Sequence, residues 1–279
     1  MKVESTDLQN STTPAITYSE CYAQVLLGDC LELMKDIPNG SIDMILCDLP
    51  YGTTACKWDT IIPFDKLWEQ YERIIKPNGA MVLTASQPFT TVMIGSNLKL
   101  FKYELIWQKT KCGSFQLAKS MPMKYHENIC VFYKQQPTYN PQWIKASDAS
   151  INRHKYNFSE IPTRGLQHMA SGVYKPKQEK DSSMAYPRSI IEFKNERKNY
   201  HPTEKPIGLF EWLIKTYTNE GDLVLDNTAG SGTTAISCLN TNRQFIVMEK
   251  EQKYYDIILK RVGDFNKNFQ PQTLFGNEM

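Results

Sequence analysis

The 279-residue sequence has no run of about 18 apolar residues, so it offers no helix that could span a membrane. It also lacks a basic start followed by an apolar stretch, and its first 20 residues are rich in serine and threonine, unlike a secretory signal. No cysteine and histidine spacing is typical of a zinc site, and we expect no bound metal. These absences predict a cytoplasmic protein without a membrane partner.

The cysteines are also uninformative as a framework. Seven of them, an odd number with no repeated close pairing, favour reduced thiols over disulfides. There is no internal repeat, and 41% hydrophobic with 22% charged residues is ordinary globular usage, which excludes collagen-like, coiled-coil and disordered classes. The length allows one large α/β domain with an insertion.

Strand-like apolar runs alternate with helical spacing along most of the chain. We expect strands at 23–27, 42–47, 80–84, 105–108, 127–133, 223–225 and 245–248, and helices at 31–37, 64–75, 89–98, 207–217, 233–239 and 252–262. The string Lys76-Pro77-Asn78-Gly79 predicts a turn before the strand at 80–84. Alternating strands and helices predict a mostly parallel sheet.

The segment 134–200 differs from the rest of the chain in composition. It holds 12 Lys and Arg against 6 Asp and Glu, a net charge of +6, whereas the whole chain carries only +2. Eight aromatic residues are interleaved with this charge, a composition suited to phosphate contacts and base stacking. A solvated insertion with a small apolar cluster would look similar. On the nucleic-acid reading, Lys175, Lys177 and Arg188 are candidate phosphate contacts.

Two short strings carry the chemistry. The second in chain order is Asp226-Asn227-Thr228-Ala229-Gly230-Ser231-Gly232-Thr233-Thr234, which joins a predicted strand to a predicted helix. A glycine turn at a helix N-terminus lets a charged ligand approach backbone N–H groups closely. Glu249, at the end of the next strand, stands where an acid that binds ribose is expected. The glycines could also serve only a tight connection.

The glycine turn favours S-adenosylmethionine over a dinucleotide. The third glycine of G-x-G-x-x-G is missing, and an aspartate at the strand end would repel a pyrophosphate. Asp226 could instead face the ammonium and sulfonium groups of S-adenosylmethionine. The carboxylate of S-adenosylmethionine would contact turn amides and Lys205, and the ribose hydroxyls of the cofactor would contact Glu249.

The first string is Asp48-Leu49-Pro50-Tyr51, at the end of the strand expected at 42–47. The exocyclic amine of a base is a poor nucleophile, and a site that methylates it must aim its lone pair. Asp48 and the Leu49 carbonyl can accept its two N–H groups, while Pro50 fixes the backbone. Tyr51 offers a ring on which a flipped base can stack. Alone, the string could equally be an acidic turn with a packed tyrosine.

Taken together and in this order, the strings resemble the β-group of bacterial and phage DNA amino-methyltransferases. The resemblance runs from about residue 24 to 262. It includes Leu27-Gly28-Asp29-Cys30, His126-Glu127-Asn128, His201-Pro202-Thr203-Glu204-Lys205-Pro206, and the strand ending at Glu249.

The resemblance implies a permuted, Rossmann-like methyltransferase fold with a target-recognition insertion. Asp29 and Cys30 would contact the adenine ring of S-adenosylmethionine, and Thr203 and Lys205 would hold its methionine end. The implied parts are a leader (1–22), a catalytic half (23–133), the insertion (134–200), a cofactor-binding half (201–265) and a tail (266–279). Double-stranded DNA is the implied substrate; a homodimer and a cognate restriction endonuclease are compatible with family habit.

Two positions depart from the usual family pattern. Leu49 stands where proline is frequent, which matters little because only a backbone carbonyl is needed there. Asn227-Thr228 replace the commoner Pro-Phe and could reshape the packing around the methionine tail.

The expected activity is methylation of the 6-amino group of a flipped adenine, because adenine enzymes usually carry Asp at the first catalytic position. The alternative is the 4-amino group of cytosine, whose enzymes usually carry Ser there. Methylation of RNA or of a protein glutamine, and a silent DNA-binding subunit, are weaker readings. Their usual features, a different first catalytic residue, a different motif order or a broken motif, are missing.

Overall fold

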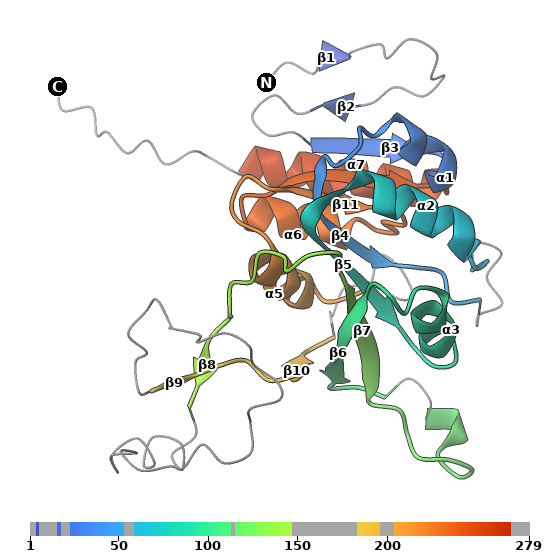
Figure 1. Ribbon diagram of the computed structural model, residues 1–279, viewed down its shortest axis with the longest axis vertical. Coiled ribbons are helices and arrows are strands. Elements are labelled where there is room, and N and C mark those ends of the chain that lie inside the picture. The colour runs from blue at the N-terminus through green and yellow to red at the C-terminus, as the bar shows by residue number, and fades with distance from the viewer. Residues whose placement is uncertain are drawn as a thin grey trace. The chain divides into compact units, whose positions relative to one another are not determined.

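The computed structural model describes residues 4–5, 16–17, 23–52, 59–112, 115–146, 183–195 and 204–268 (Figure 1). The chain divides into two compact units, Pro141–Arg188 and the remainder. In the smaller unit, β8 (Ile144–Lys145) pairs antiparallel with β9 (Met184–Ala185), and the rings of Trp143 and Tyr186 pack with centroids 4.4 Å apart. This unit lies within the segment 134–200 singled out by its charge.

In the larger unit, the described residues form a sheet in the order β1-β2-β3-β12-β11-β4-β5-β7-β6-β10. The strands are β1 (Glu4–Ser5), β2 (Ile16–Thr17), β3 (Ala23–Leu27), β4 (Ile42–Asp48), β5 (Ile75–Ala85), β6 (Phe101–Lys109), β7 (His126–Phe132), β10 (Ile190–Phe193), β11 (Leu223–Asp226) and β12 (Gln244–Glu249). From β3 to β5 all neighbours are parallel, whereas β7 is antiparallel to β5 and β6. The carboxyl ends of β3, β12, β11, β4 and β5 therefore share one edge.

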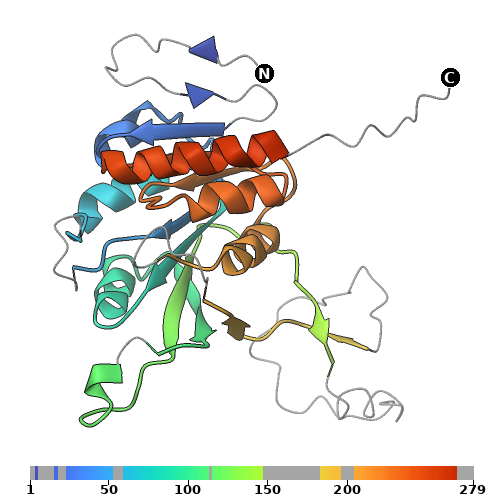
Figure 2. The ribbon, with the colours of Figure 1, turned by 180° about the vertical axis from the view of Figure 1, so that it is seen from behind.

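Helices cover both faces of this sheet (Figures 1 and 2). One face carries α1 (Cys30–Leu33), the short 3-10 helix η1 (Met34–Asp36), α2 (Phe64–Ile74) and α3 (Phe89–Ser96); the other carries α5 (Ile207–Tyr217), α6 (Thr233–Asn240) and α7 (Gln252–Asn268). Strand residues alternate between two cores, as a pleat requires: Met44 and Leu46 face α5–α7, while Ile45 and Cys47 face α1–α3. A doubly covered sheet explains why these strands are continuous apolar runs.

The predicted turn at 76–79 is wrong. These residues lie inside β5, where the pairing with β4 shifts between Ile42↔Ile75 and Met44↔Ala80 and the extra residues form an irregularity in the strand. A Cβ at Gly79 would lie 2.8 Å from the carbonyl oxygen of Asp43 and 2.7 Å from the Ile75 side chain. The glycine therefore permits a close approach of β4 to β5.

The remaining predicted helices and strands are present, with ends shifted by a few residues. The largest change is α7, which continues to Asn268 instead of ending at 262. The strand β6 begins four residues earlier than expected, at Phe101; its first half alternates between half-buried and exposed residues and so lacks the apolar run by which a strand was expected. Among the described residues, the buried Cys30, Cys47 and Cys130 are thiols outside any disulfide. None of the described helices is long and apolar enough to cross a bilayer.

Candidate functional site

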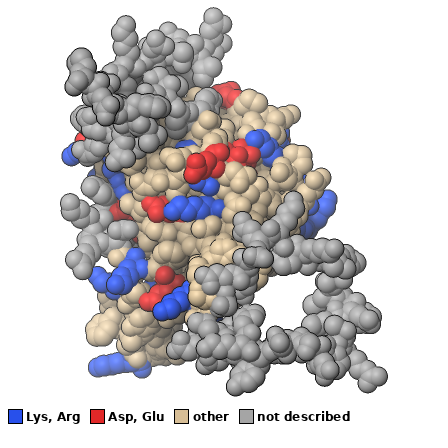
Figure 3. All heavy atoms as spheres, turned by 90° about the vertical axis from the view of Figure 1, so that its left-hand side faces the viewer, with Lys and Arg blue, Asp and Glu red and all other residues tan. Residues whose placement is uncertain are grey.

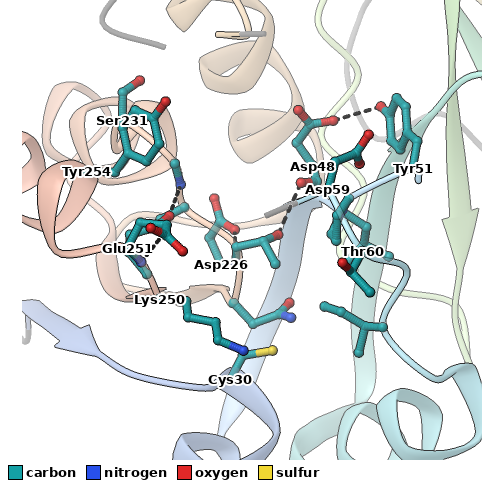
Figure 4. Close-up of a pocket in the computed structure, with 18 of the residues that line it drawn as sticks. Cys30, Asp48, Tyr51, Asp59, Thr60, Asp226, Ser231, Lys250, Glu251 and Tyr254 are labelled. Atoms are coloured by element: carbon teal, nitrogen blue, oxygen red, sulfur yellow. Dashed lines mark hydrogen bonds between the residues drawn. The ribbon is translucent and has the colours of Figure 1, made fainter. Parts of the chain in front are cut away.

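A cavity of about 390 Å³ opens at the shared carboxyl edge of the sheet (Figure 4). The expected catalytic residues Asp48, Leu49, Pro50 and Tyr51 line it. So do most of the expected cofactor residues: Asp29, Cys30, Lys205, Asp226, Asn227, Thr228, Ala229, Gly230, Ser231, Thr233 and Glu249. Because β4 pairs directly with β11, the two strings lie side by side although 178 residues separate Asp48 from Asp226 in the chain.

Six expected residues lie away from the cavity or outside the described residues. Gly232 and Thr234 do not line the cavity, although Thr234 reaches it through its bond to Asp226. Thr203, Lys175 and Lys177 lie outside the described residues. Arg188 belongs to the smaller unit.

Asp48 is the centre of a hydrogen-bond network at the end of β4. Its Oδ1 atom accepts bonds from the Tyr51 hydroxyl, at 2.7 Å, and from the Thr84 hydroxyl. Its Oδ2 atom lies 2.5 Å from the ammonium of Lys205. Thr84 is the residue opposite Asp48 on β5, so sheet register delivers it to this site. The carboxylate is thus held in one orientation by three donors.

Lys205 is a buried cation between two carboxylates. Only 6% of its side chain is exposed, and Glu127 Oε2 lies 3.5 Å from its Nζ atom. Burial alone would lower the pKa of Lys205, but the charges of Asp48 and Glu127 outweigh burial and raise it. Lys109, at the end of β6, bonds to the same glutamate. Lys205 therefore stays protonated at neutral pH.

Tyr51 has one ring face occupied by the protein. Its ring stacks on Phe89 of α3 with centroids 5.0 Å apart and an interplanar angle of 27°. Burial, followed by the charge of Asp48, raises the pKa of its hydroxyl well above the ordinary value. The hydroxyl therefore remains a donor to Asp48, as Figure 4 shows.

The glycine turn buries Asp226 at the end of β11. Its Oδ2 atom accepts a 2.5 Å bond from the Thr234 hydroxyl, and its Oδ1 atom accepts the Thr228 N–H at 3.0 Å. Burial raises the pKa of Asp226 to about 7, although the two bonds lower it. Gly232, with φ +84, opens α6, and a Cβ there would lie 3.0 Å from Ile258. The turn needs glycine at this position.

The residues that depart from the family pattern tie β11 to β4. Asn227 Oδ1 accepts the Tyr71 hydroxyl at 2.5 Å and the Cys47 thiol at 2.9 Å. The hydroxyl of Thr228 donates to the main-chain carbonyl of Asp48 at 3.1 Å. The Asn227–Thr228 pair therefore fixes the cofactor turn directly to the catalytic turn, a role that the sequence did not indicate.

Two further acids line the opposite side of the cavity. Glu249 accepts the backbone N–H groups of Gly230 and Glu251, each at 2.8 Å. Asp29 caps α1 by accepting the Leu31 N–H at 3.0 Å, and its other oxygen lies 3.1 Å from Lys250. Burial raises the pKa of Glu249, because these backbone bonds offset only part of its desolvation.

The lining suits S-adenosylmethionine. The cavity volume is within the range for such ligands. Asp226 is a buried carboxylate with no cation bonded to it among the described residues, which fits a cationic ligand group. The buried Nδ2 amide of Asn227 has no hydrogen-bond acceptor among the described residues, so a donor is also available to a ligand.

Several residues of the site could not be found from linear motifs. Thr84, Tyr71, Phe89 and Lys109 come from separate elements and act through side chains that reach the two turns. Of the supporting residues, only Glu127 lies in a string that carries the family resemblance, His126-Glu127-Asn128, and the resemblance implied no role for it. It lines the cavity beside Lys205.

A mostly parallel sheet covered on both faces, with a nucleoside-sized acidic cavity at its carboxyl edge, is the arrangement of Rossmann-like methyltransferases. Solved structures agree with this fold. The M1.HpyAVI–SAM complex has a TM-score of 0.57 at 24% identity, covering 85% of this chain and 98% of its own. The PvuII DNA methyltransferase, described as cytosine-N4-specific, has a TM-score of 0.59 at 16% identity, covering 88% and 91%.

The family follows from sequence. The DNA methylase family model matches residues 42–260, most of the chain. The Type II methyltransferase M.HpaI of Haemophilus parainfluenzae is 26% identical over 259 residues, covering 87% of this chain and 75% of that protein. The chain belongs to the DNA methylase family, and it is a DNA methyltransferase that uses S-adenosylmethionine.

Proposed function

We propose that this enzyme methylates the exocyclic 6-amino group of an adenine flipped out of double-stranded DNA. The observation that carries the proposal is the Asp48 turn placed next to the Asp226 turn in a single cavity. An aspartate at the first catalytic position favours adenine. The substrate is DNA of the bacterial or phage-infected cytoplasm.

Asp48 and Leu49 orient the amine. A carboxylate offers about four lone-pair positions; Tyr51, Thr84 and Lys205 use three in the described site. The fourth can accept one N–H of the target amine, and the Leu49 carbonyl can accept the second. The lone pair of the amine then points into the cavity. Asp48 also stabilises the positive charge that develops on the nitrogen.

The flipped base stacks on Tyr51. Phe89 stacks on one face of this ring, and the Lys205 ammonium lies over the ring at 5.7 Å from its centroid. The base therefore uses the face away from Phe89. Stacking on an aromatic ring contributes roughly 1–3 kcal/mol per base and replaces part of the stacking lost on flipping.

The second half of the cavity holds the cofactor. When bound, S-adenosylmethionine supplies an electrophilic methyl group on its sulfonium. Asp226 faces its cationic amino-acid end, together with Lys205 for the carboxylate, while Glu249 binds the ribose and Asp29 and Cys30 border the adenine ring. Thr203 and the lining turn residues 227–231 and Thr233 complete this half.

Expression in a methylation-deficient bacterium tests the proposed activity. We expect 6-methyladenine at one short sequence throughout the genome, mapped by single-molecule sequencing. Methylated cytosine in place of 6-methyladenine would show that the target base is cytosine. An unmodified genome would contradict the activity. The Asp48→Asn variant is the matched control, and it should leave the genome unmodified.

We also propose that the segment 134–200 grips the DNA. Its net charge of +6 supports phosphate contacts. The affinity of the whole enzyme for duplex DNA should fall steeply with salt, and replacing Lys175, Lys177 and Arg188 with glutamine should reduce the slope of log affinity against log salt by about 2 to 3. Replacing Lys35, Lys66 and Lys102 is the charge-matched control. An unchanged slope in the first variant would contradict the contacts. A homodimer and a cognate endonuclease stay predictions from the resemblance.

A further inference from the structure

The loop between β6 and β7, residues 110–125, is an unusual surface. It follows Lys109 and precedes His126, and it includes the short 3-10 helix η2 (Phe115–Leu117). In Figures 1 and 2 this green segment projects beyond the end of the sheet. Its described part has internal order, since the Leu117 carbonyl accepts the N–H groups of Ser120 and Met121 at 2.9 and 3.0 Å. We call it the β6–β7 loop.

The β6–β7 loop exposes apolar side chains that do not pack into either hydrophobic core. Phe115 is 75% exposed, and the other large apolar residues of the loop's described part are between 41% and 52% exposed: Leu117, Met121, Met123 and Tyr125. A soluble protein seldom leaves such a group uncovered unless a partner covers it. The loop therefore indicates a binding surface.

The charge of the same stretch identifies the partner as an anion. From Lys109 to Tyr125 the sequence has four lysines and no aspartate or glutamate. On the face shown in Figure 3, by contrast, basic and acidic side chains are interspersed over the described surface. Lysines with protruding Phe, Leu and Met match DNA, which offers phosphates outside and apolar base faces inside.

The base of the loop adjoins the reaction site. Lys109 bonds to Glu127, which lines the cavity next to Lys205, and Lys124 bonds to Ser86, two residues after Thr84. β6 runs parallel to the strands that end at the cavity, so the loop leaves the sheet at the edge that carries Asp48. DNA whose target base reaches Asp48 must pass close to this loop.

We propose that the β6–β7 loop enters the duplex at the target base pair and that Phe115 and Leu117 fill the space left by the flipped base. Apolar wedges of this kind keep a base step open. The inference rests on the proposed methyl transfer to a flipped adenine and adds the element that opens the helix. It assigns a substrate contact outside the segment 134–200.

The test uses the full-length enzyme and two duplexes that carry its mapped site. In one duplex the target adenine is paired with thymine; in the other it faces an abasic site, so it has no pairing to break. The Phe115→Ala/Leu117→Ala variant should methylate the paired duplex about 10- to 100-fold more slowly than wild type in single turnover. On the abasic duplex it should come within about threefold of wild type, because opening no longer needs the wedge.

Leu98→Ala is the matched control, since Leu98 is 67% exposed and lies in the turn before β6, at the opposite end of that strand. It should behave as wild type on both duplexes. An equal loss on both duplexes, or no loss on either, would overturn the wedge. So would conversion of a dimer to a monomer by the double variant in sedimentation, since the loop would then cover a second copy. If the wild-type enzyme methylates neither duplex, the proposed methyl transfer is contradicted, and this inference falls with it.

Discussion

Replacing Asp48 with asparagine should lower the methylation rate about 100- to 10,000-fold while S-adenosylmethionine binding stays within about threefold. Asparagine keeps the shape of the side chain but loses the negative charge and an acceptor for the amine. The rate is measured in single turnover on duplex DNA, and binding by calorimetry. Asp36→Asn, an exposed acid on η1, is the control.

A second substitution, at Lys205, distinguishes the effect of Asp48→Asn on the methylation rate from its effect on the stability of the fold. Without Asp48, a cation that is 6% exposed keeps only Glu127 and should destabilise the fold by about 3 kcal/mol. The double variant Asp48→Asn/Lys205→Met removes both charges and should recover most of the lost melting temperature but none of the rate. Recovery of methylation in the double variant, or loss of cofactor binding in the single one, would contradict the role given to Asp48.

The affinity for S-adenosylmethionine should increase as pH rises from about 5.5 to 8, with the bend near the pKa of Asp226, about 7. Burial keeps this carboxyl protonated below that pH, and a protonated group cannot attract a cation. Above it the carboxylate is free to pair, so binding below the bend releases a proton. Calorimetry in two buffers of different ionisation enthalpy measures both the affinity and the released proton.

Asp226→Asn should weaken binding about 30- to 1,000-fold, the loss of roughly 2–4 kcal/mol expected for one partner of a buried charge pair. Its pH profile should lack the bend. The cofactor's own amino group titrates in both proteins, so the difference between the two profiles isolates Asp226. Glu220→Gln, an exposed acid before β11, should keep the wild-type profile. A flat wild-type profile would contradict the prediction.

Local rules predicted much of the fold. The helix α5 has the bounds that its apolar spacing and the preceding Pro206 indicated, Ile207–Tyr217, because a proline at a helix start needs no partner from elsewhere. The prediction of a turn at 76–79 was wrong because proline and glycine also occur at strand irregularities. Only the distance from Gly79 to Asp43 distinguishes the two cases, and that distance depends on how β4 and β5 pair.

In the site, too, the residues in local motifs were predictable from the sequence and those that depend on strand pairing were not. Asp48 and Asp226 were found because each stands in a short string with its own chemistry. Their supports were not found: Tyr71 reaches Asn227 from 156 residues away, and Thr84 reaches Asp48 only because the two strands are in register. A single sequence contains no sign of strand register beyond the pattern of burial.

The order β3-β12-β11-β4 has a consequence for how the enzyme matures during synthesis. β3, which leads into Asp29 and Cys30, and β4, which ends in Asp48, do not pair with each other; β12 and β11, made last, fill the place between them. Until those strands leave the ribosome, both earlier strands present open edges, and pairing across such sequence distances is slow. Methyl-transfer competence therefore arises only once β12 has been made, later than the segment 134–200.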